Sequence, residues 1–177
     1  MAKPLAEVFT HCPACGAQRK DAGANPFRCA NEPCQFVYFF GPITAVGAIV
    51  ADDKNQILFI RRAKDPGKDK LGLPGGFVDS GERLEIAVAR EVKEETNLDV
   101  TTSEYLTSFP NLYEYRGTQI PVTDIFFHCR VQSFDGMHAV DGEATGFHLT
   151  TPTKADLDDM AFPSNRKALE MYLARGN

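Results

Sequence analysis

A helix that carries glutamates on its apolar side is the feature that most constrains this chain. Residues 84–96 have helical periodicity, and at about 100° per residue the apolar side chains form one stripe, made by Leu84, Ala87, Val88 and Val92. Glu91 and Glu95 fall inside this stripe one turn apart, and Glu94 lies near its edge. Carboxylates on the core-facing side of a helix are costly unless they are paired or bind a metal. The pattern predicts a site for Mg²⁺ or Mn²⁺, hard cations that prefer oxygen ligands.

The residues before this helix indicate a loop that lies close to it. Gly75 and Gly76 permit close approach of the backbone and leave carbonyl groups available to help ligate a cation, although Gly75 alone could equally be part of a turn. Arg90 can pair with a nearby carboxylate, and Glu82 is the candidate. Such an ion pair would fix the loop against the helix.

The rest of the central region has mostly the pattern of strands. Apolar runs predict strands at 37–40, 43–50, 57–61, 105–108, 112–115, 122–131 and 145–149. Turns are predicted at residues 52–55 and at Arg116-Gly117, and Ser164 is predicted to cap a helix over 165–174. Several strands with one long central helix and another at the end predict an α/β fold, in which helices pack on a mixed sheet.

Four of the five cysteines lie in a segment with little apolar character, residues 8–36. They form two pairs, the first separated by two residues and the second by four, and comprise Cys12, Cys15, Cys29 and Cys34. Four thiolates at such spacing suit tetrahedral Zn²⁺, and a closed set of ligands predicts a structural site. His11 could replace one of the ligands.

The loop and the glutamate helix together resemble the Nudix box, G-x5-E-x7-R-E-U-x-E-E-x-G-U, where U is a bulky aliphatic residue. The matching positions are Gly76, Glu82, Arg90, Glu91, Val92, Glu94, Glu95 and Leu98. Asn97 stands where the family has its last glycine, and asparagine also tolerates the left-handed backbone of a helix end. The resemblance implies a Nudix α/β/α sandwich with a mixed sheet at residues 41–177, preceded by a small zinc ribbon at residues 1–40.

The resemblance also implies hydrolysis of a pyrophosphate bond by water activated beside divalent cations. The implied ligands for Mg²⁺ or Mn²⁺ are the Gly76 carbonyl and the carboxylates of Glu91, Glu94 and Glu95. Arg90 and Glu82 would form the structural ion pair of the catalytic site. In several family members the base, or a further metal ligand, comes from outside the box. Glu143 is the candidate here, and an exposed loop acid is the alternative interpretation.

A zinc ribbon directly before a Nudix domain resembles the NADH pyrophosphatase subgroup. Phe77 fits that subgroup, because a phenylalanine at this position can stack on a base, and Glu143 matches its late glutamate. Residues 107–113 depart from the subgroup, since its Gln-Pro-Trp unit is absent. NADH, NAD, ADP-ribose, FAD, diadenosine polyphosphates and NAD-capped RNA therefore stay open as substrates.

Aromatic and basic residues outside the box are further candidates for substrate contacts. Phe109 and Tyr113 could stack on a base, as could Tyr115, which shares a strand face with Tyr113, and core packing is the equal alternative. Five basic residues before the box could meet phosphates or simply stay solvated; these are Arg61, Arg62, Lys64, Lys68 and Lys70.

Composition restricts the classes of partner and the cellular compartment that we predict for this chain. The chain has 24 acidic and 19 basic residues, which argues against nucleic acid as a main partner, a capped RNA end excepted. It shows no signal peptide and no apolar run of about 20 residues, so we predict a cytoplasmic protein with reduced thiols. Cys129, in an apolar strand, is then an ordinary core thiol. Ribbon-bearing relatives are often dimers, which implies a homodimer.

The predicted function is divalent-cation-dependent hydrolysis of nucleoside diphosphate derivatives of the NADH, NAD or ADP-ribose type. The alternative is a regulatory module that binds nucleotide or nucleic acid through the ribbon and has a non-catalytic Nudix fold. The complete carboxylate set of Glu91, Glu94 and Glu95 favours the enzyme.

Overall fold

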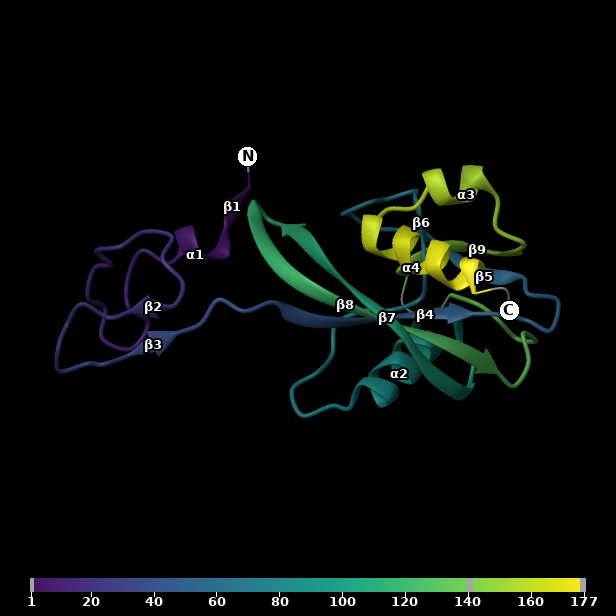
Figure 1. Cartoon of the computed structure of the whole chain (residues 1–177), viewed down its shortest axis with the longest axis horizontal. Coiled ribbons are helices and arrows are strands. Elements are labelled where there is room, and N and C mark those ends of the chain that lie inside the picture. Colours follow the sequence, from purple (N-terminus) through teal and green to yellow (C-terminus); the bar gives the residue numbers. More distant parts are fainter. Residues whose placement is uncertain (1, 140–141, 176–177) are drawn as a thin grey trace. The chain divides into compact units, whose positions relative to one another are not determined.

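The computed structural model describes residues 2–139 and 142–175 and divides into two units (Figure 1). The first unit comprises Met1–Ile43 and Leu112–Val122, and the second comprises Thr44–Asn111 and Thr123–Asn177. The first unit therefore includes the tip of a hairpin that begins and ends in the second. Among the described residues, no helix is both long enough and apolar enough to cross a membrane.

Two sheets form the centre of the second unit. In one sheet β8 (Thr118–Val131) pairs with β7 (Val100–Tyr115) and with β4 (Ile43–Val50). The start of β8, which belongs to the first unit, also pairs with β1 (Lys3–Pro4) of that unit. In the other sheet β5 (Ile57–Arg62) lies antiparallel between β6 (Leu71–Gly72) and β9 (Ala144–Thr150). β1 runs parallel to β8, whereas β6 and β9 run antiparallel to β5, so both kinds of strand pairing occur, as the predicted mixed sheet requires.

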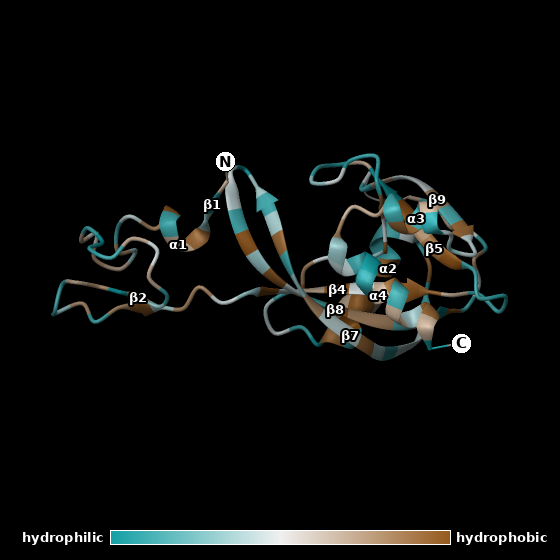
Figure 2. Cartoon of the chain, turned by 45° about the horizontal axis from the view of Figure 1, so that its top comes forward, coloured by the Kyte–Doolittle hydropathy of each residue, from teal (hydrophilic) through white to brown (hydrophobic). Residues whose placement is uncertain are grey.

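Helices cover both faces of these sheets. α2 (Leu84–Thr96) packs through Val88 and Val92 into one core cluster, whereas α4 (Pro163–Ala174) packs through Leu169 into the other (Figure 1). A short helix, α3 (Lys154–Asp158), precedes α4. β4 contributes side chains to both clusters, which explains its unbroken apolar run. Figure 2 shows this hydrophobic character along β4 and β5. The fold is an α/β/α sandwich, so the predicted fold class is confirmed.

Two local predictions are corrected by the structure. The two strands predicted at 105–108 and 112–115 form one continuous strand, β7, because pairing with β8 holds the intervening residues extended. Ser164 was predicted as the N-cap of the last helix, but Phe162 occupies that position and Ser164 lies in the first turn. The Ser164 hydroxyl donates instead to the buried carboxylate of Asp124. The N-cap prediction is therefore wrong, because the Ser164 hydroxyl donates its hydrogen bond to an acid that is distant in the sequence.

The first unit is built from short elements. α1 (Leu5–Val8) follows β1, and β2 (Phe27–Arg28) pairs antiparallel with β3 (Val37–Tyr38). β1 runs parallel to the start of β8, which belongs to the same unit. Its buried core is small and consists of Cys12, Phe27 and Phe40.

Candidate functional site

The inward face of α2 carries two carboxylates, as the helical wheel predicts. The Glu91 side chain is 12% exposed and Glu95 is buried, with 5% of its surface exposed. The Glu94 side chain points outward and is 48% exposed. The helix ends at Asn97, whose left-handed backbone (φ 61°) takes the place that glycine has in the box pattern. Helix geometry thus places Glu91 and Glu95 together and Glu94 beside them.

The loop before α2 presses its backbone against both inward carboxylates. The Gly75 amide donates to Glu95 Oε2 at 2.9 Å, and a Cβ at Gly75 would lie 2.1 Å from the Val46 carbonyl oxygen. A Cβ at Gly76 would lie 2.6 Å from both carboxylate oxygens of Glu91. The Gly76 carbonyl accepts from the Val46 amide at 2.9 Å and has a second lone pair for another partner. Gly75 therefore requires glycine and is more than a turn residue, whereas a side chain at Gly76 would displace the Glu91 carboxylate.

Arg90 ties the loop to the helix. Its Nε and Nη2 atoms donate to the two carboxylate oxygens of Glu82, each at 2.9 Å. Nη1 donates to Glu91 at 2.8 Å and to Glu94 at 3.1 Å, and Nη2 also reaches the Phe77 carbonyl at 3.1 Å. The hydrogen bonds from Arg90 lower the pKa of Glu82 to about 2. The structure therefore contains the predicted Arg90–Glu82 ion pair.

Acidic side chains are crowded together at the buried end of this site. Burial raises the pKa of Glu95 to about 8, and the carboxylates of Glu91 and Glu143 act in the same direction. The Gly75 amide and the charge of Arg62 act in the opposite direction without cancelling the effect. Burial also raises the pKa of Glu91, against the influence of Arg90. Crowded carboxylates with an incomplete counter-charge fit a divalent cation, so the donor set suits Mg²⁺ or Mn²⁺.

Glu143 comes into this site from a distant part of the sequence. It directly precedes β9, and its charge acts on both Glu91 and Glu95. Its side chain is 52% exposed and accepts from Lys64 Nζ at 3.3 Å. The structure thus places the predicted candidate within electrostatic reach of the carboxylates.

The structure separates the basic residues that the sequence groups together. Arg61 and Lys70 both pair with Asp159, which sequence reasoning did not single out. Arg62 donates through Nε to the Pro66 carbonyl at 2.9 Å, and its guanidinium lies 4.9 Å from the ring centre of Phe162. Within residues 2–139 and 142–175, Arg62 has no carboxylate at ion-pair distance. No local pattern could reveal these partners, because Asp159 and Phe162 lie about one hundred residues away in the chain.

The aromatic candidates do not share one location. Phe77 lies in the loop beside the carboxylates and is 42% exposed. Phe109 is partly buried against the core cluster of α4, with Lys167 Nζ 5.9 Å above its ring. Tyr113 and Tyr115 belong to the first unit. Only Phe77 among the described candidates therefore adjoins the glutamates within the second unit.

The four predicted cysteines of the first unit meet in space. All four Sγ atoms lie within 4.8 Å of one another, with Cys12 and Cys34 at 3.8 Å and Cys15 and Cys29 at 3.5 Å. Zinc–sulfur bonds of about 2.3 Å in a tetrahedron require sulfur separations of about 3.8 Å, so the cluster fits zinc. His11 is exposed and contacts Thr10 rather than this cluster, which consists of the cysteines alone among the described residues.

The fifth cysteine behaves differently. Cys129 is fully buried in the core cluster of α2, and burial raises the pKa of its thiol to about 12. The prediction of an ordinary core thiol is confirmed.

An α/β/α sandwich with a glycine loop and an inward-facing pair of glutamates defines a Nudix-type domain. Residues 41–172 match the NUDIX domain family, so the chain belongs to the Nudix family. The solved structure of a NUDIX hydrolase from Nitrosomonas europaea aligns with a TM-score of 0.69 at 24% identity, covering 93% of this chain and 90% of that one.

Two curated relatives match parts of the sequence. An ADP-ribose pyrophosphatase from Methanocaldococcus jannaschii is 50% identical over 60 residues, which are 34% of this chain and 35% of the relative. A NAD-capped RNA hydrolase, NudC, from Vibrio vulnificus is 32% identical over 106 residues, which are 60% of this chain and 40% of the relative. The chain thus matches between a third and two fifths of the length of these relatives.

Proposed function

We propose that this protein hydrolyses the pyrophosphate bond of nucleoside diphosphate derivatives of the ADP-ribose or NAD(H) type, with Mg²⁺ or Mn²⁺ as cofactor. One water adds across the P–O–P linkage and gives two phosphate monoesters. The observation that carries the proposal is the packing of the Glu91 and Glu95 carboxylates against the Gly75-Gly76 backbone. A buried acidic pair held in this way costs free energy unless a cation binds there.

The proposal gives the residues of the α2 site distinct roles. Glu91 and Glu95, with Glu94 and the free lone pair of the Gly76 carbonyl, would hold the cation. A bound divalent cation supplies charge neutralisation and a water of lowered pKa. Arg90 keeps the acids in place through its hydrogen bonds, with Glu82 as the fixed end of that network. Removing Arg90 would therefore disorder the ligands rather than remove a reacting group.

Two residues outside the box complete the proposed site. Glu143, within electrostatic reach of the acids, is the proposed base or additional ligand. Arg62 is the proposed phosphate contact, because its guanidinium is held by the Pro66 carbonyl and the Phe162 ring and has no acidic partner among the described residues. A guanidinium held in this way suits bidentate contact with phosphate. Arg62→Gln should raise KM about tenfold, whereas Lys68→Gln, at an exposed cation of the loop that follows β5, should not.

The substrate is best tested with a panel of compounds. ADP-ribose, NADH, NAD, FAD, diadenosine polyphosphate and NAD-capped RNA would each be incubated with Mg²⁺ or Mn²⁺, and the monophosphate products identified. The names of the two curated relatives support ADP-ribose and NAD-capped RNA, while the absent Gln-Pro-Trp unit weighs against a standard NADH pocket. Turnover of any of these with release of monophosphates supports the proposal. No turnover with either metal, by protein that binds zinc and is folded, would overturn it in favour of a binding module.

Three further features belong to the same proposal. The four cysteines would hold a structural Zn²⁺, supported by their sulfur separations. The protein would be cytoplasmic, which suits a cluster of reduced thiols. It would act as a homodimer, which light scattering of the purified protein would check.

A further inference from the structure

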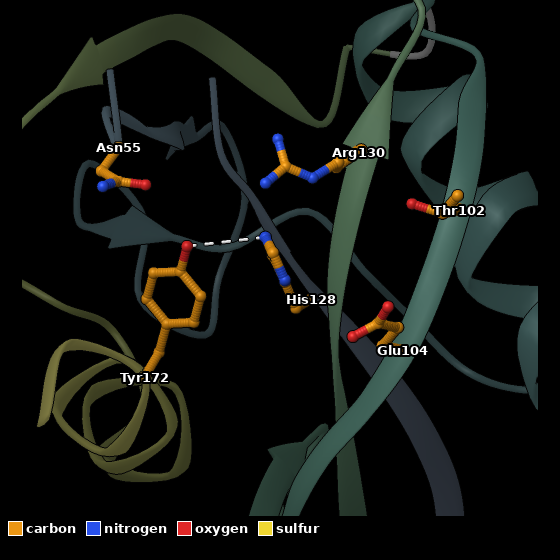
Figure 3. A pocket seen from close by; sticks show the side chains of 6 residues that line it. All are labelled: Asn55, Thr102, Glu104, His128, Arg130 and Tyr172. Atoms are coloured by element: carbon orange, nitrogen blue, oxygen red, sulfur yellow. Dashed lines mark hydrogen bonds between the residues drawn. The ribbon is translucent and has the colours of Figure 1, made fainter. Parts of the chain in front are cut away.

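A polar pocket lies in the second unit, between the β7–β8 pair, the turn after β4 and helix α4 (Figure 3). Its volume is about 350 Å³, and it is lined by Asn55, Thr102, Glu104, His128, Arg130 and Tyr172. This volume falls at the small end of the range for small-molecule sites. None of these residues belongs to the loop or helix of the glutamate site.

The alternation of side chains along β8 separates this pocket from the glutamates. Phe127 and Cys129 point into the core cluster that contains α2. His128 and Arg130 therefore point to the opposite face of the strand, where α4 packs. Tyr172 of α4 belongs to the core cluster on that face. The pocket and the glutamate site thus lie on opposite faces of the sheet.

Hydrogen-bond donors dominate one side of the pocket (Figure 3). The Arg130 guanidinium, the His128 imidazole, the Tyr172 hydroxyl and the Asn55 amide come together there, and the Tyr172 hydroxyl lies 3.5 Å from His128 Nε2. Burial and the charge of Arg130 lower the pKa of His128, so at neutral pH the ring is neutral and keeps one N–H to donate. These donors suit an anion with several oxygens.

The charge of Arg130 is available for such an anion. Its ion pair with Asp53 spans 3.7 Å, and the Asp53 side chain is fully exposed. Exposed ion pairs of this kind are weak, so a ligand oxygen can replace the carboxylate at little cost. Thr102 and Glu104 of β7 add a hydroxyl and a carboxylate at the other side of the pocket, which suit the hydroxyl groups of a ligand.

We propose that this pocket binds a small phosphate monoester that carries hydroxyl groups, a sugar phosphate or a nucleoside monophosphate. The phosphate lies against Arg130, His128 and Tyr172, and the hydroxyl groups lie against Glu104 and Thr102. The inference goes beyond the proposed hydrolase activity and does not depend on it, because no residue of the glutamate site takes part.

The test is a calorimetric titration of the full chain, with its zinc, with ribose 5-phosphate, AMP and inorganic phosphate. Mg²⁺ and Mn²⁺ are left out, so that cation-dependent binding at α2 is absent. We expect ribose 5-phosphate or AMP to bind more tightly than inorganic phosphate, and the stronger of the two esters identifies the ligand class. We expect R130Q to weaken that binding about tenfold, because it removes one charged hydrogen-bond partner. H128N should weaken it less.

Two matched variants locate the binding. R166Q removes an exposed arginine that pairs with Asp158 and Glu170 outside the pocket, and E91Q removes a carboxylate of the glutamate site. Both should bind the ester like the unaltered protein, and thermal melts check that every variant is folded. The proposal is overturned if none of the three probes binds at about 1 mM. It is also overturned if folded R130Q and H128N bind normally, or if E91Q changes the affinity as strongly as R130Q does, since an ester beside the glutamates would respond to that carboxylate.

Discussion

Glu91 and Glu95 stand on a helix that is packed into a large core, whereas the four cysteines of the first unit have only a small core around them. In the second unit α2 buries Val88 and Val92 against strands that are themselves covered on both faces. In the first unit the buried cluster around the cysteines consists of Cys12, Phe27 and Phe40, with partly buried neighbours. Both regions gather side chains of the kinds that ligate metals, but by different means.

The difference lies in what a bound metal would do for each unit. Hydrophobic packing already places the glutamates, so a cation there would relieve the cost of the crowded acids and serve chemistry. The cysteine unit has too little apolar surface to fold well without a cross-link, so a bound Zn²⁺ there would itself supply folding free energy. A bound cation would thus be catalytic in the second unit and structural in the first.

Removal of zinc should give the largest effect and should be confined to the first unit. Structural zinc sites contribute on the order of 10 kcal/mol, so Cys15→Ser or chelation should abolish zinc binding and amide-exchange protection there. Protection in α2 should stay unchanged, as hydrogen exchange with mass spectrometry would show. Cys129→Ala, which removes the core thiol instead, should keep one zinc per chain. Full amide-exchange protection of the first unit after chelation would contradict the view that this unit depends on zinc whereas the second does not.

The next largest effect is expected on catalysis. Glu95→Gln removes a charged ligand while keeping its shape, so kcat/KM for the substrate found in the panel should fall about 1,000-fold, equal to about 4 kcal/mol. Zinc content and the melting temperature should not fall. Glu85→Gln, on the exposed start of the same helix, serves as the matched control and should stay fully active. An active Glu95→Gln variant would disprove the assigned metal site.

A third prediction concerns pH and the metal-free protein. The pKa of Glu95 is about 8 in the folded chain against an ordinary value of 4.5, so the folded state binds more protons between these values. Stability should therefore fall as pH rises from about 5 to about 8, by on the order of 1–3 kcal/mol. Urea unfolding in EDTA would show this slope, and Glu95→Gln should flatten it. A stability that rises over this interval would contradict the buried acidic pair.

The smallest expected effect comes from the loop. Gly76→Ala places a methyl group 2.6 Å from the Glu91 carboxylate, which must move. We expect about a tenfold loss of kcat/KM, equal to about 1.4 kcal/mol, with little change in zinc content or melting temperature. Gly146→Ala is the control, because an added Cβ there meets nothing within 4 Å. Its kcat/KM, measured by steady-state kinetics, should be unchanged. Equal activities of the two variants would argue against close contact between loop and acid.

Local patterns were sufficient for several elements of the structure. The helix over 84–96 begins and ends where its apolar stripe and Asn97 predict, because periodicity and the helix stop are local properties. The cysteine spacing likewise predicts the four-sulfur cluster. Ser164 shows the limit of this reasoning, because its partner Asp124 is 40 residues away in the chain and no local pattern indicates it.

The sequence by itself determined the helix, its inward glutamates, the glycine loop and the cysteine cluster, since each depends on residues close together in the chain. Tertiary structure alone decided the partners of Arg61 and Arg62, because Asp159 and Phe162 lie between α3 and α4 and meet these arginines only when that segment packs against the end of β5. It also decided that Phe109 packs in the core beside α4 while Phe77 is exposed. The polar pocket depends on the same packing, since its residues come from four separate segments. Contacts between distant segments depend on which faces of the helices and strands pack against one another, and no short stretch of sequence encodes that packing.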